Sequence, residues 1–231
     1  MSMRASRAAG VTLVEVLIAV TLLSLLAVGM LYSMRVGLMA FSKVDTSLMR
    51  NRRAAGAQRV VEDELAGIVP VVTPCGGGKI LFFQGEPQTM RLISTFSLQQ
   101  GWRGQPQILE LFVIPGENGD GVRLVVNEIP YDGPLSASQV CTGDGHFAPV
   151  VAGPNSFVLA DKLASCQFQY LTAPDNPSDP AIWQPFFKSK LWPYGVRIQM
   201  APLEPDPSRL QPITATVPLF LYRNPEMQYA D

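Results

Sequence analysis

The feature that most constrains this chain is an unbroken apolar run near its N-terminus, residues 11–34, which contains a single charged side chain, Glu15. A helix of about 24 residues measures roughly 36 Å, enough to cross the hydrocarbon core of a membrane with some tilt. A charge at membrane depth costs at least about 2.5 kcal/mol on insertion scales, so an acid there is expected to have a function and a partner. The run therefore predicts a membrane-spanning helix whose carboxylate takes part in an interaction.

A short leader with two arginines precedes the run and ends at Gly10, and the helix then opens with Val-Thr-Leu-Val-Glu. This arrangement resembles the class III signal of type IV pilins and pseudopilins. The resemblance implies that a prepilin peptidase cuts after Gly10 and methylates the new amine of Val11. It also implies that Glu15 pairs with the N-terminal amine of a neighbouring subunit. The sequence departs from the family's usual pattern at Val11, where the family has Phe, and at Val14, where it has Leu.

Two other interpretations of the run are an ordinary secretory signal and an uncleaved single-span anchor. A secretory signal has an apolar region of about 7 to 15 residues followed by a small-residue cleavage site, and this run is longer and lacks such a site at its end. Charge does not set the orientation, because Arg4 and Arg7 lie on one side of the run while Arg35 and Lys43 lie close on the other. The predicted topology therefore depends on the leader motif.

The distribution of proline divides the rest of the chain. All 20 prolines lie at Pro70 or later, and a proline-free stretch is compatible with one long helix. We predict a leader over 1–10, a helix over 11–69 that spans the membrane over 11–34 and forms a stalk over 35–69, and a single head domain over 70–231. The head is large enough to bury its own core.

The balance of basic and acidic residues also changes at Pro70. Up to residue 69 the chain has 8 Lys and Arg against 5 Asp and Glu, whereas from Pro70 onward it has 10 against 14. Proteins that bind nucleic acid normally present a strongly basic face. The mildly acidic head therefore predicts no nucleic-acid partner.

The stalk half of the helix is amphipathic. Its apolar residues recur at intervals of three and four and form one stripe: Ala54, Ala57, Val61, Leu65 and Ile68. We expect this stripe to pack against the head and the helix to end before Pro70, because helical geometry is disfavoured in the residue that precedes a proline.

The head reads as β structure, in short β-branched and aromatic runs separated by Gly, Pro, Asn and Asp. The predicted strands are 80–84, 90–96, 108–114, 122–129, 157–159, 166–171, 196–200 and 213–222. The glycine-rich turn 115–121 predicts an antiparallel hairpin, and the five prolines of 172–193 predict a long surface loop. The fold class is therefore α+β and pilin-like, with a long, partly transmembrane helix packed on an antiparallel sheet.

Several pieces of the head look like the J-type minor pseudopilin of type II secretion. They are Phe83-Gln84-Gly85, 91–94, 108–113, 122–125, 166–170, Trp183 and 191–198. Two departures are Phe186-Phe187, where the family tends to have a second Trp, and Trp192, which interrupts a Leu-Pro pair. The closing Tyr222-Arg223-Asn224 is more like minor pilins of the type IV pilus.

The three cysteines, Cys75, Cys141 and Cys166, all lie in the head, on the side of the membrane expected to be oxidising. They allow one disulfide of unknown pairing, or three buried thiols. We expect no metal, because no CxxC spacing exists and His146 is the only histidine. We also expect no cofactor.

Four further candidate sites have plainer explanations. Cys75-Gly76-Gly77-Gly78-Lys79 lacks the first glycine and the final Ser or Thr of a phosphate loop, so a flexible connector is favoured. Glu117, Asn118 and Asp120 lack the alternating acids of a calcium loop. The other two candidates are a hydrolase site, with His146 as base near Ser136, Ser138 and Asp144, and an anion-binding group of Arg50, Arg52 and Arg53. Proximity in sequence does not indicate a catalytic triad, and the arginines are expected to form a solvated helix face.

Two hypotheses of different classes follow. In the first, the chain is a structural subunit, not an enzyme, that assembles with other minor and major pseudopilins on an inner-membrane platform, with its head in the periplasm. The resemblance implies a tip complex that primes the filament for protein export, and a minor pilin of a type IV pilus is the alternative. In the second, the chain is a membrane-anchored binding module or enzyme that never polymerises. Glu15 separates the two, because an isolated anchor gains nothing from an intramembrane acid.

Overall fold

The computed structural model describes residues 12–98, 102–174, 179–203 and 213–221, and within these ranges it leaves the side chains of 42–55, 102 and 103 undescribed. The chain divides into two compact units, Met1–Arg50 and Asn51–Asp231. The helix α1, Leu13–Ala66, contributes residues to both units. Each unit is described by itself below.

The first unit contains the apolar part of α1. Residues Leu13–Phe41 form a helical segment of 29 residues with a mean hydropathy of 2.5, long and apolar enough to cross a membrane. All its side chains are exposed. The hydroxyls of Thr21 and Ser24 do not interrupt it, because Thr21 donates a hydrogen bond to the Ile18 carbonyl and Ser24 to the Val20 carbonyl.

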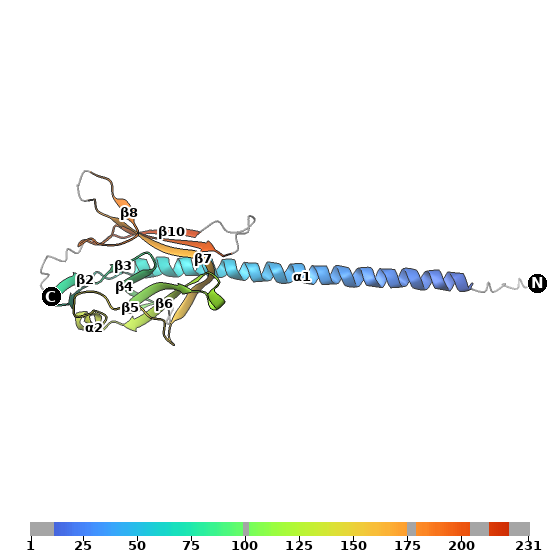
Figure 1. Cartoon of the computed structure of the whole chain (residues 1–231), viewed down its shortest axis with the longest axis horizontal. Helices are drawn as coiled ribbons and strands as arrows, with labels where there is room; N and C mark the ends of the chain where they lie inside the picture. The colour runs from blue at the N-terminus through green and yellow to red at the C-terminus, as the bar shows by residue number, and fades with distance from the viewer. Residues whose placement is uncertain (1–11, 99–101, 175–178, 204–212, 222–231) are drawn as a thin grey trace, which may run out of the picture. The chain divides into compact units, whose positions relative to one another are not determined.

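The second unit is built around an antiparallel sheet with the strand order β10-β9-β7-β6-β5-β4-β3 (Figure 1). The strands are β3, Gln84–Gly85; β4, Thr89–Ser97; β5, Trp102–Pro115; β6, Val122–Pro130; β7, Phe157–Thr172; β9, Gly195–Pro202; and β10, Ile213–Pro218. Strand β8, Ile182–Gln184, adds to β7. A separate two-stranded sheet pairs β1, Val72–Cys75, with β2, Gly78–Leu81. The predicted α+β class, a long helix followed by an antiparallel sheet, is confirmed.

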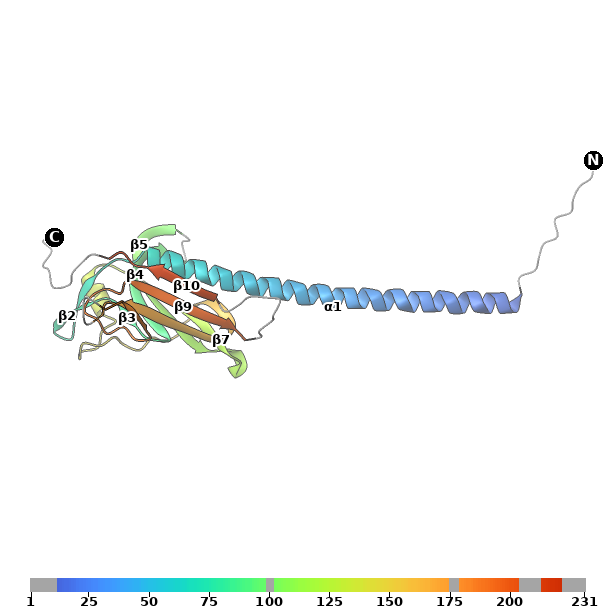
Figure 2. The ribbon, with the colours of Figure 1, turned by 90° about the horizontal axis from the view of Figure 1, so that it is seen from above.

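The end of α1 covers one face of this sheet. Ala57, Val61 and Leu65 are almost completely buried and share one core with alternate residues of the strands, among them Leu92 and Leu109. Figure 2 shows β7, β9 and β10 side by side next to this part of the helix. Three members of the predicted stripe therefore pack as expected, and the side chain of the fourth, Ala54, lies outside the described residues.

The predicted end of the helix at Val69 is wrong, because α1 ends at Ala66. Gly67 lies so close to β4 that a Cβ atom there would stand 2.6 Å from the Ser94 hydroxyl. Ile68, the fifth member of the predicted stripe, is half-buried and forms a β-bridge with Ser94, and the Val69 amide donates to the Ile93 carbonyl over 2.8 Å. The amides of Gly67 and Ile68 still donate to carbonyls of the last helical turn, whereas the Gly67 carbonyl and the Val69 amide hydrogen-bond to β4 and draw the chain out of the helix.

The opposite face of the sheet is covered by the segment that connects β6 to β7. This segment contains the short helix α2, Pro134–Ser138, whose Ala137 packs with Phe82, Ile93 and Ile108 in a second, smaller core. Successive residues of β4 therefore alternate between the two faces, as a strand buried on both sides requires.

Other strand predictions need correction. The predicted strands 157–159 and 166–171 are parts of the single strand β7, and 80–84 is divided between β2 and β3. Strand β10 ends at Pro218, before the predicted limit of 222. The predicted loop 172–193 contains the short strand β8. The hairpin across 115–121 is confirmed by the antiparallel pairing of β5 with β6.

Candidate functional site

The N-terminal site lies partly outside the described residues, because Gly10 and Val11 precede Thr12. Thr12 begins the helix: its hydroxyl accepts a hydrogen bond from the Glu15 amide over 3.3 Å, and its carbonyl accepts from the same amide over 3.0 Å. Thr12 is therefore the N-cap and Glu15 stands at the third helical position, the spacing of a capping box. A carboxylate in the first turn is also favoured by the helix dipole.

Within the described residues, the Glu15 side chain has no ion-pair partner. The run 11–34 around Glu15 carries no other charged side chain. An ion-pair partner for the carboxylate therefore has to come from outside this run. That arrangement is unfavourable for an isolated span and becomes favourable when a cation is brought near in a low dielectric.

The cysteines form one pair. The structure joins Cys75 at the end of β1 to Cys141 by a disulfide, with a Cα–Cα distance of 5.7 Å across 66 residues of sequence. Cys166 on β7 is a buried free thiol, and burial raises its pKa to about 12. A thiol with such a pKa is a poor nucleophile and a poor metal ligand.

The glycine-rich stretch is the turn between β1 and β2. Gly76 has a φ of 58°, and a Cβ atom there would lie 2.2 Å from the Gly145 amide nitrogen. The stretch leads into a strand, whereas the backbone amides of a phosphate loop precede a helix. Its glycines allow close packing between the hairpin and the 141–147 segment.

The turn between β5 and β6 places a cation beside Glu117, one of the residues weighed above as calcium ligands and interpreted as ordinary turn residues. Arg123 donates to Glu117 over 3.0 Å. Within the described ranges, no group of three or more His, Cys, Asp or Glu residues is close enough to hold a metal ion.

The residues weighed above as a hydrolase site make separate contacts. Ser136 donates to the Gly133 carbonyl and Ser138 to the Leu135 carbonyl, so both hydroxyls serve the backbone around α2. The Thr142 hydroxyl binds Asp144 and lowers the pKa of that carboxyl. The side chain of His146 is exposed. The side chains of Arg50, Arg52 and Arg53 lie outside the described residues.

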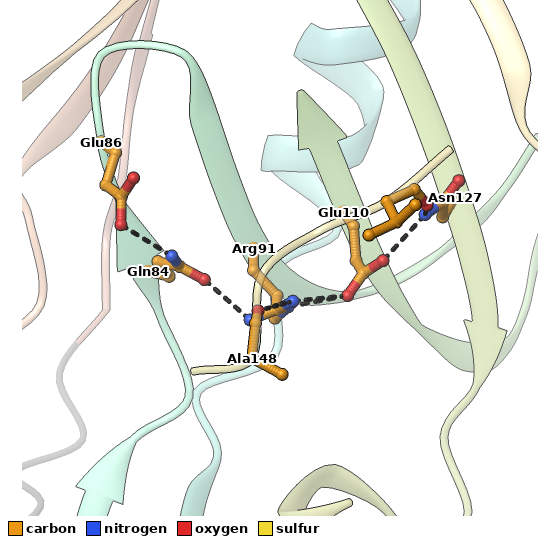
Figure 3. A network of polar contacts seen from close by, with 7 residues as sticks. Gln84, Glu86, Arg91, Glu110, Asn127 and Ala148 are labelled. Carbon is orange, nitrogen blue, oxygen red and sulfur yellow. Dashed lines mark hydrogen bonds and ion pairs between the residues drawn. The ribbon is translucent and has the colours of Figure 1, made fainter. Parts of the chain in front are cut away.

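Sequence reasoning missed a buried polar network on the face of the sheet away from α1 (Figure 3). Arg91 donates to Glu110 through two nitrogens, over 2.9 and 2.7 Å, and to Gln84 over 2.7 Å. Asn127 donates to the other Glu110 oxygen over 2.9 Å. Gln84, Arg91, Glu110 and Asn127 are directly paired on β3, β4, β5 and β6.

The network also holds the segment that covers it. Arg91 donates to the Ala148 carbonyl over 2.9 Å, Asn127 donates to the Val151 carbonyl over 3.1 Å, and Ser156 donates to Asn127 over 2.5 Å. Arg91 is 1% exposed and also lies 5.2 Å from the centroid of the Phe147 ring. A buried charge with a paired carboxylate and further hydrogen bonds is tolerated, so this network is a structural clamp on the 148–156 stretch.

The comparison with known families matches residues 5–31 to the prokaryotic N-terminal methylation motif. No curated protein sequence matches the chain significantly. The matched residues include Gly10, Val11 and Glu15, and they overlap the apolar helix that can serve as a single-pass membrane anchor. The chain therefore carries the N-terminal signature of type IV pilin-like and pseudopilin proteins, followed by an α+β head.

Proposed function

We propose that this protein is a minor pseudopilin, a structural subunit of the filament that drives type II secretion. The observation that carries the proposal is the position of Glu15. It is an acid five residues after Gly10, within the matched methylation motif and in the first turn of α1, and it is the single charged side chain of the apolar run 11–34. Few other functions give a selective reason to keep a charge there.

In this proposal the chain is inserted in the inner membrane as a precursor whose leader is residues 1–10. Prepilin peptidase cuts after Gly10 and methylates Val11. The new amine of an adjacent subunit then compensates the charge of Glu15 when the helices gather into a filament, because opposite charges attract strongly in a low dielectric. An assembly platform in the inner membrane adds the subunits, and the helix spans the membrane over residues 11–34 and forms the stalk from residue 35 to its end at Ala66.

The Cys75–Cys141 disulfide supports a head in the periplasm, since disulfides persist in oxidising compartments. The J-type assignment, with a place in a tip complex beside other minor pseudopilins, has looser support. The resembling pieces at 83–85, 91–94, 108–113 and 122–125 lie on the neighbouring strands β3 to β6. A minor pilin of a type IV pilus is the alternative, and the closing Tyr222-Arg223-Asn224 favours it.

The first test is processing. Replacing Gly10 by Val should leave the full-length precursor in the membrane, whereas mass spectrometry of the wild-type chain should find a methylated Val11 at its N-terminus. A wild-type chain that still begins at Met1, or that begins beyond residue 30, would contradict the proposal.

The second test is assembly. Glu15→Gln and Glu15→Leu should be processed after Gly10 and inserted normally, because both remove a charge that membrane insertion penalises. We expect partial loss of co-purification with other minor subunits and of secretion of a native substrate, in a strain without the native copy. Wild-type values of both with Glu15→Leu would instead favour a non-polymerising anchor.

A further inference from the structure

A groove in the head gathers most of its lysines. It has a volume of about 970 Å³ and is lined by residues 79–81, 83–86, 145–147 and 186–190. From Pro70 onward the chain has four lysines, and three of them, Lys79, Lys188 and Lys190, line this groove. That concentration is unexpected in a region whose sequence is net acidic.

The positive charge of the groove is not neutralised within the chain as described. All three lysines are exposed, and none has an ion-pair partner among the described residues. Lys188 lies over the Phe186 ring, 5.9 Å from its centroid. The acid in the lining, Glu86, accepts a hydrogen bond from Gln84 over 2.8 Å. The groove therefore offers free ammonium groups to an anionic partner.

Aromatic side chains form the apolar part of the groove and hold its shape. Phe83 contacts Phe187 and Tyr170 edge to face, with ring-centroid distances of 4.9 Å and 5.8 Å. The amide of Phe187 donates to the Gly85 carbonyl over 2.8 Å, which fixes the 186–190 wall to β3. Phe186 is 47% exposed. A preformed groove with an exposed aromatic ring loses little entropy when it binds an apolar side chain.

The backbone of β2 contributes to the same groove. Three consecutive residues of this strand, 79–81, line it, although successive side chains of a strand point to opposite faces. In the two-stranded sheet β2 pairs with β1 alone. Among the described residues no strand pairs with its other edge, where the Leu81 carbonyl accepts from the Phe83 amide over 2.8 Å, so the remaining backbone groups of this edge are left for an added extended segment.

We infer that this groove binds an extended acidic segment of a partner protein, with carboxylates on the lysines and an apolar side chain against Phe186. Lys79 lies on β2, whereas Lys188 and Lys190 lie in the 186–190 segment that is bonded to β3, so the positive charges come from two separate elements of the lining and suit a chain of several carboxylates. The volume is at the upper end of small-molecule sites, which also favours a polypeptide. This inference goes beyond the proposed function and does not depend on Gly10 processing or on Glu15.

The test uses the full chain in a neutral detergent and a fluorescein-labelled peptide of about twelve residues that contains Glu, Asp and Phe. Its matched control peptide has Gln and Asn in place of the acids. Fluorescence anisotropy should show binding of the acidic peptide at about 50 mM salt and weaker binding at about 500 mM. Equal binding of the control peptide would overturn the inference.

The matched variants identify the groove. Lys79→Gln/Lys188→Gln/Lys190→Gln should weaken binding about tenfold, because single exposed ion pairs are weak and three act together. Lys162→Gln, which changes the fourth lysine of this region on β7, should have less than about a twofold effect. Unchanged circular dichroism verifies the fold of the triple variant. Wild-type affinity in that variant would overturn the inference.

Two further measurements separate other occupants. Carbodiimide coupling followed by mass spectrometry should join peptide carboxylates to Lys79, Lys188 or Lys190. Coupling of these lysines to Glu226 or Asp231 of the same chain would instead show an intramolecular occupant and overturn the inference. Displacement of the peptide by inorganic phosphate, beyond the effect of sodium chloride at equal ionic strength, would indicate a small-anion site and also overturn it.

Discussion

The two parts of α1 differ in what covers their apolar side chains. In residues Leu13–Phe41 every large apolar side chain is more than half exposed, with Leu25 at 69%. In the last turns, Val61 and Leu65 are 0% and 1% exposed because the sheet covers them. A single helix thus supplies both a core element, which has its partners within the chain, and a segment whose partners must be lipid or other helices.

Carboxylates in the two regions differ in the same way. Glu110 is buried with its cation, Arg91, beside it, whereas Glu15 has no ion-pair partner among the described residues. The charge of Glu110 is therefore compensated within the head, whereas compensation of the Glu15 charge requires another molecule. The following predictions test that contrast through the unfolding of the head, measured with the full chain in detergent by tryptophan fluorescence, since Trp192 is buried.

The largest effect is expected for Glu110→Ala. This change leaves the Arg91 guanidinium buried without its carboxylate, and breaking such a pair costs about 3 to 5 kcal/mol. Denaturant unfolding should therefore shift strongly to lower denaturant. Glu117→Ala is the matched control, because Glu117 is 82% exposed and its pair with Arg123 is expected to contribute less than about 1 kcal/mol. Equal losses in the two variants would contradict the role of the buried network.

Truncation of an apolar side chain in each part of α1 comes next. Leu65→Ala should lower the free energy of unfolding by about 2 to 5 kcal/mol, because it leaves a cavity under the sheet. Leu25→Ala removes the same atoms from an exposed position and should leave head unfolding unchanged. If Leu65→Ala had no effect, the packing of the helix on the sheet would be wrong.

The disulfide gives a third prediction. Reduction of Cys75–Cys141 should lower the free energy of unfolding by about 2 to 4 kcal/mol, because the unfolded chain gains conformational entropy when the cross-link across 66 residues of sequence is removed. The variant Cys75→Ser/Cys141→Ser should show the lower stability without a reductant and should not respond to one. A further loss on adding reductant to this variant would assign the effect to another cause.

Local sequence patterns predicted the helix, the main strands and the β5–β6 hairpin, because periodicity and turn chemistry act over a few residues. They could not predict the Gln84–Arg91–Glu110–Asn127 network, since that requires the register of four strands. The pairing of Cys75 with Cys141 depends on contacts across 66 residues of sequence. The end of α1 at Ala66 was missed because the hydrogen bonds that the Gly67 carbonyl and the Val69 amide make to β4 are tertiary.

The smallest effect concerns a second buried acid, Glu64, on the part of α1 that packs on the sheet. It is 0% exposed, and neither carboxylate oxygen has a hydrogen-bond partner that satisfies normal geometry. Burial raises its pKa from an ordinary 4.5 to about 8, against an opposing effect of the nearby Ser94 hydroxyl, and the charges of Glu128 and Asp63 add to the increase. At neutral pH the head therefore keeps a proton on Glu64 that the unfolded chain releases.

The sign of the pH dependence follows from this difference in proton binding. Below about pH 4.5 Glu64 is protonated in both the folded and the unfolded state, so its titration does not change the free energy of unfolding. As the pH rises from 4.5 towards 8 only the folded state holds the proton, so the free energy of unfolding falls progressively. Glu64→Gln removes this titration and should stabilise the head at pH 8 by roughly 1 to 3 kcal/mol, with the gain shrinking towards pH 4.5. Asp63→Asn, at the exposed neighbouring position, should leave that slope in place. A gain in Glu64→Gln that is equal at pH 5 and pH 8 would mean that the carboxyl is not titrating in this range.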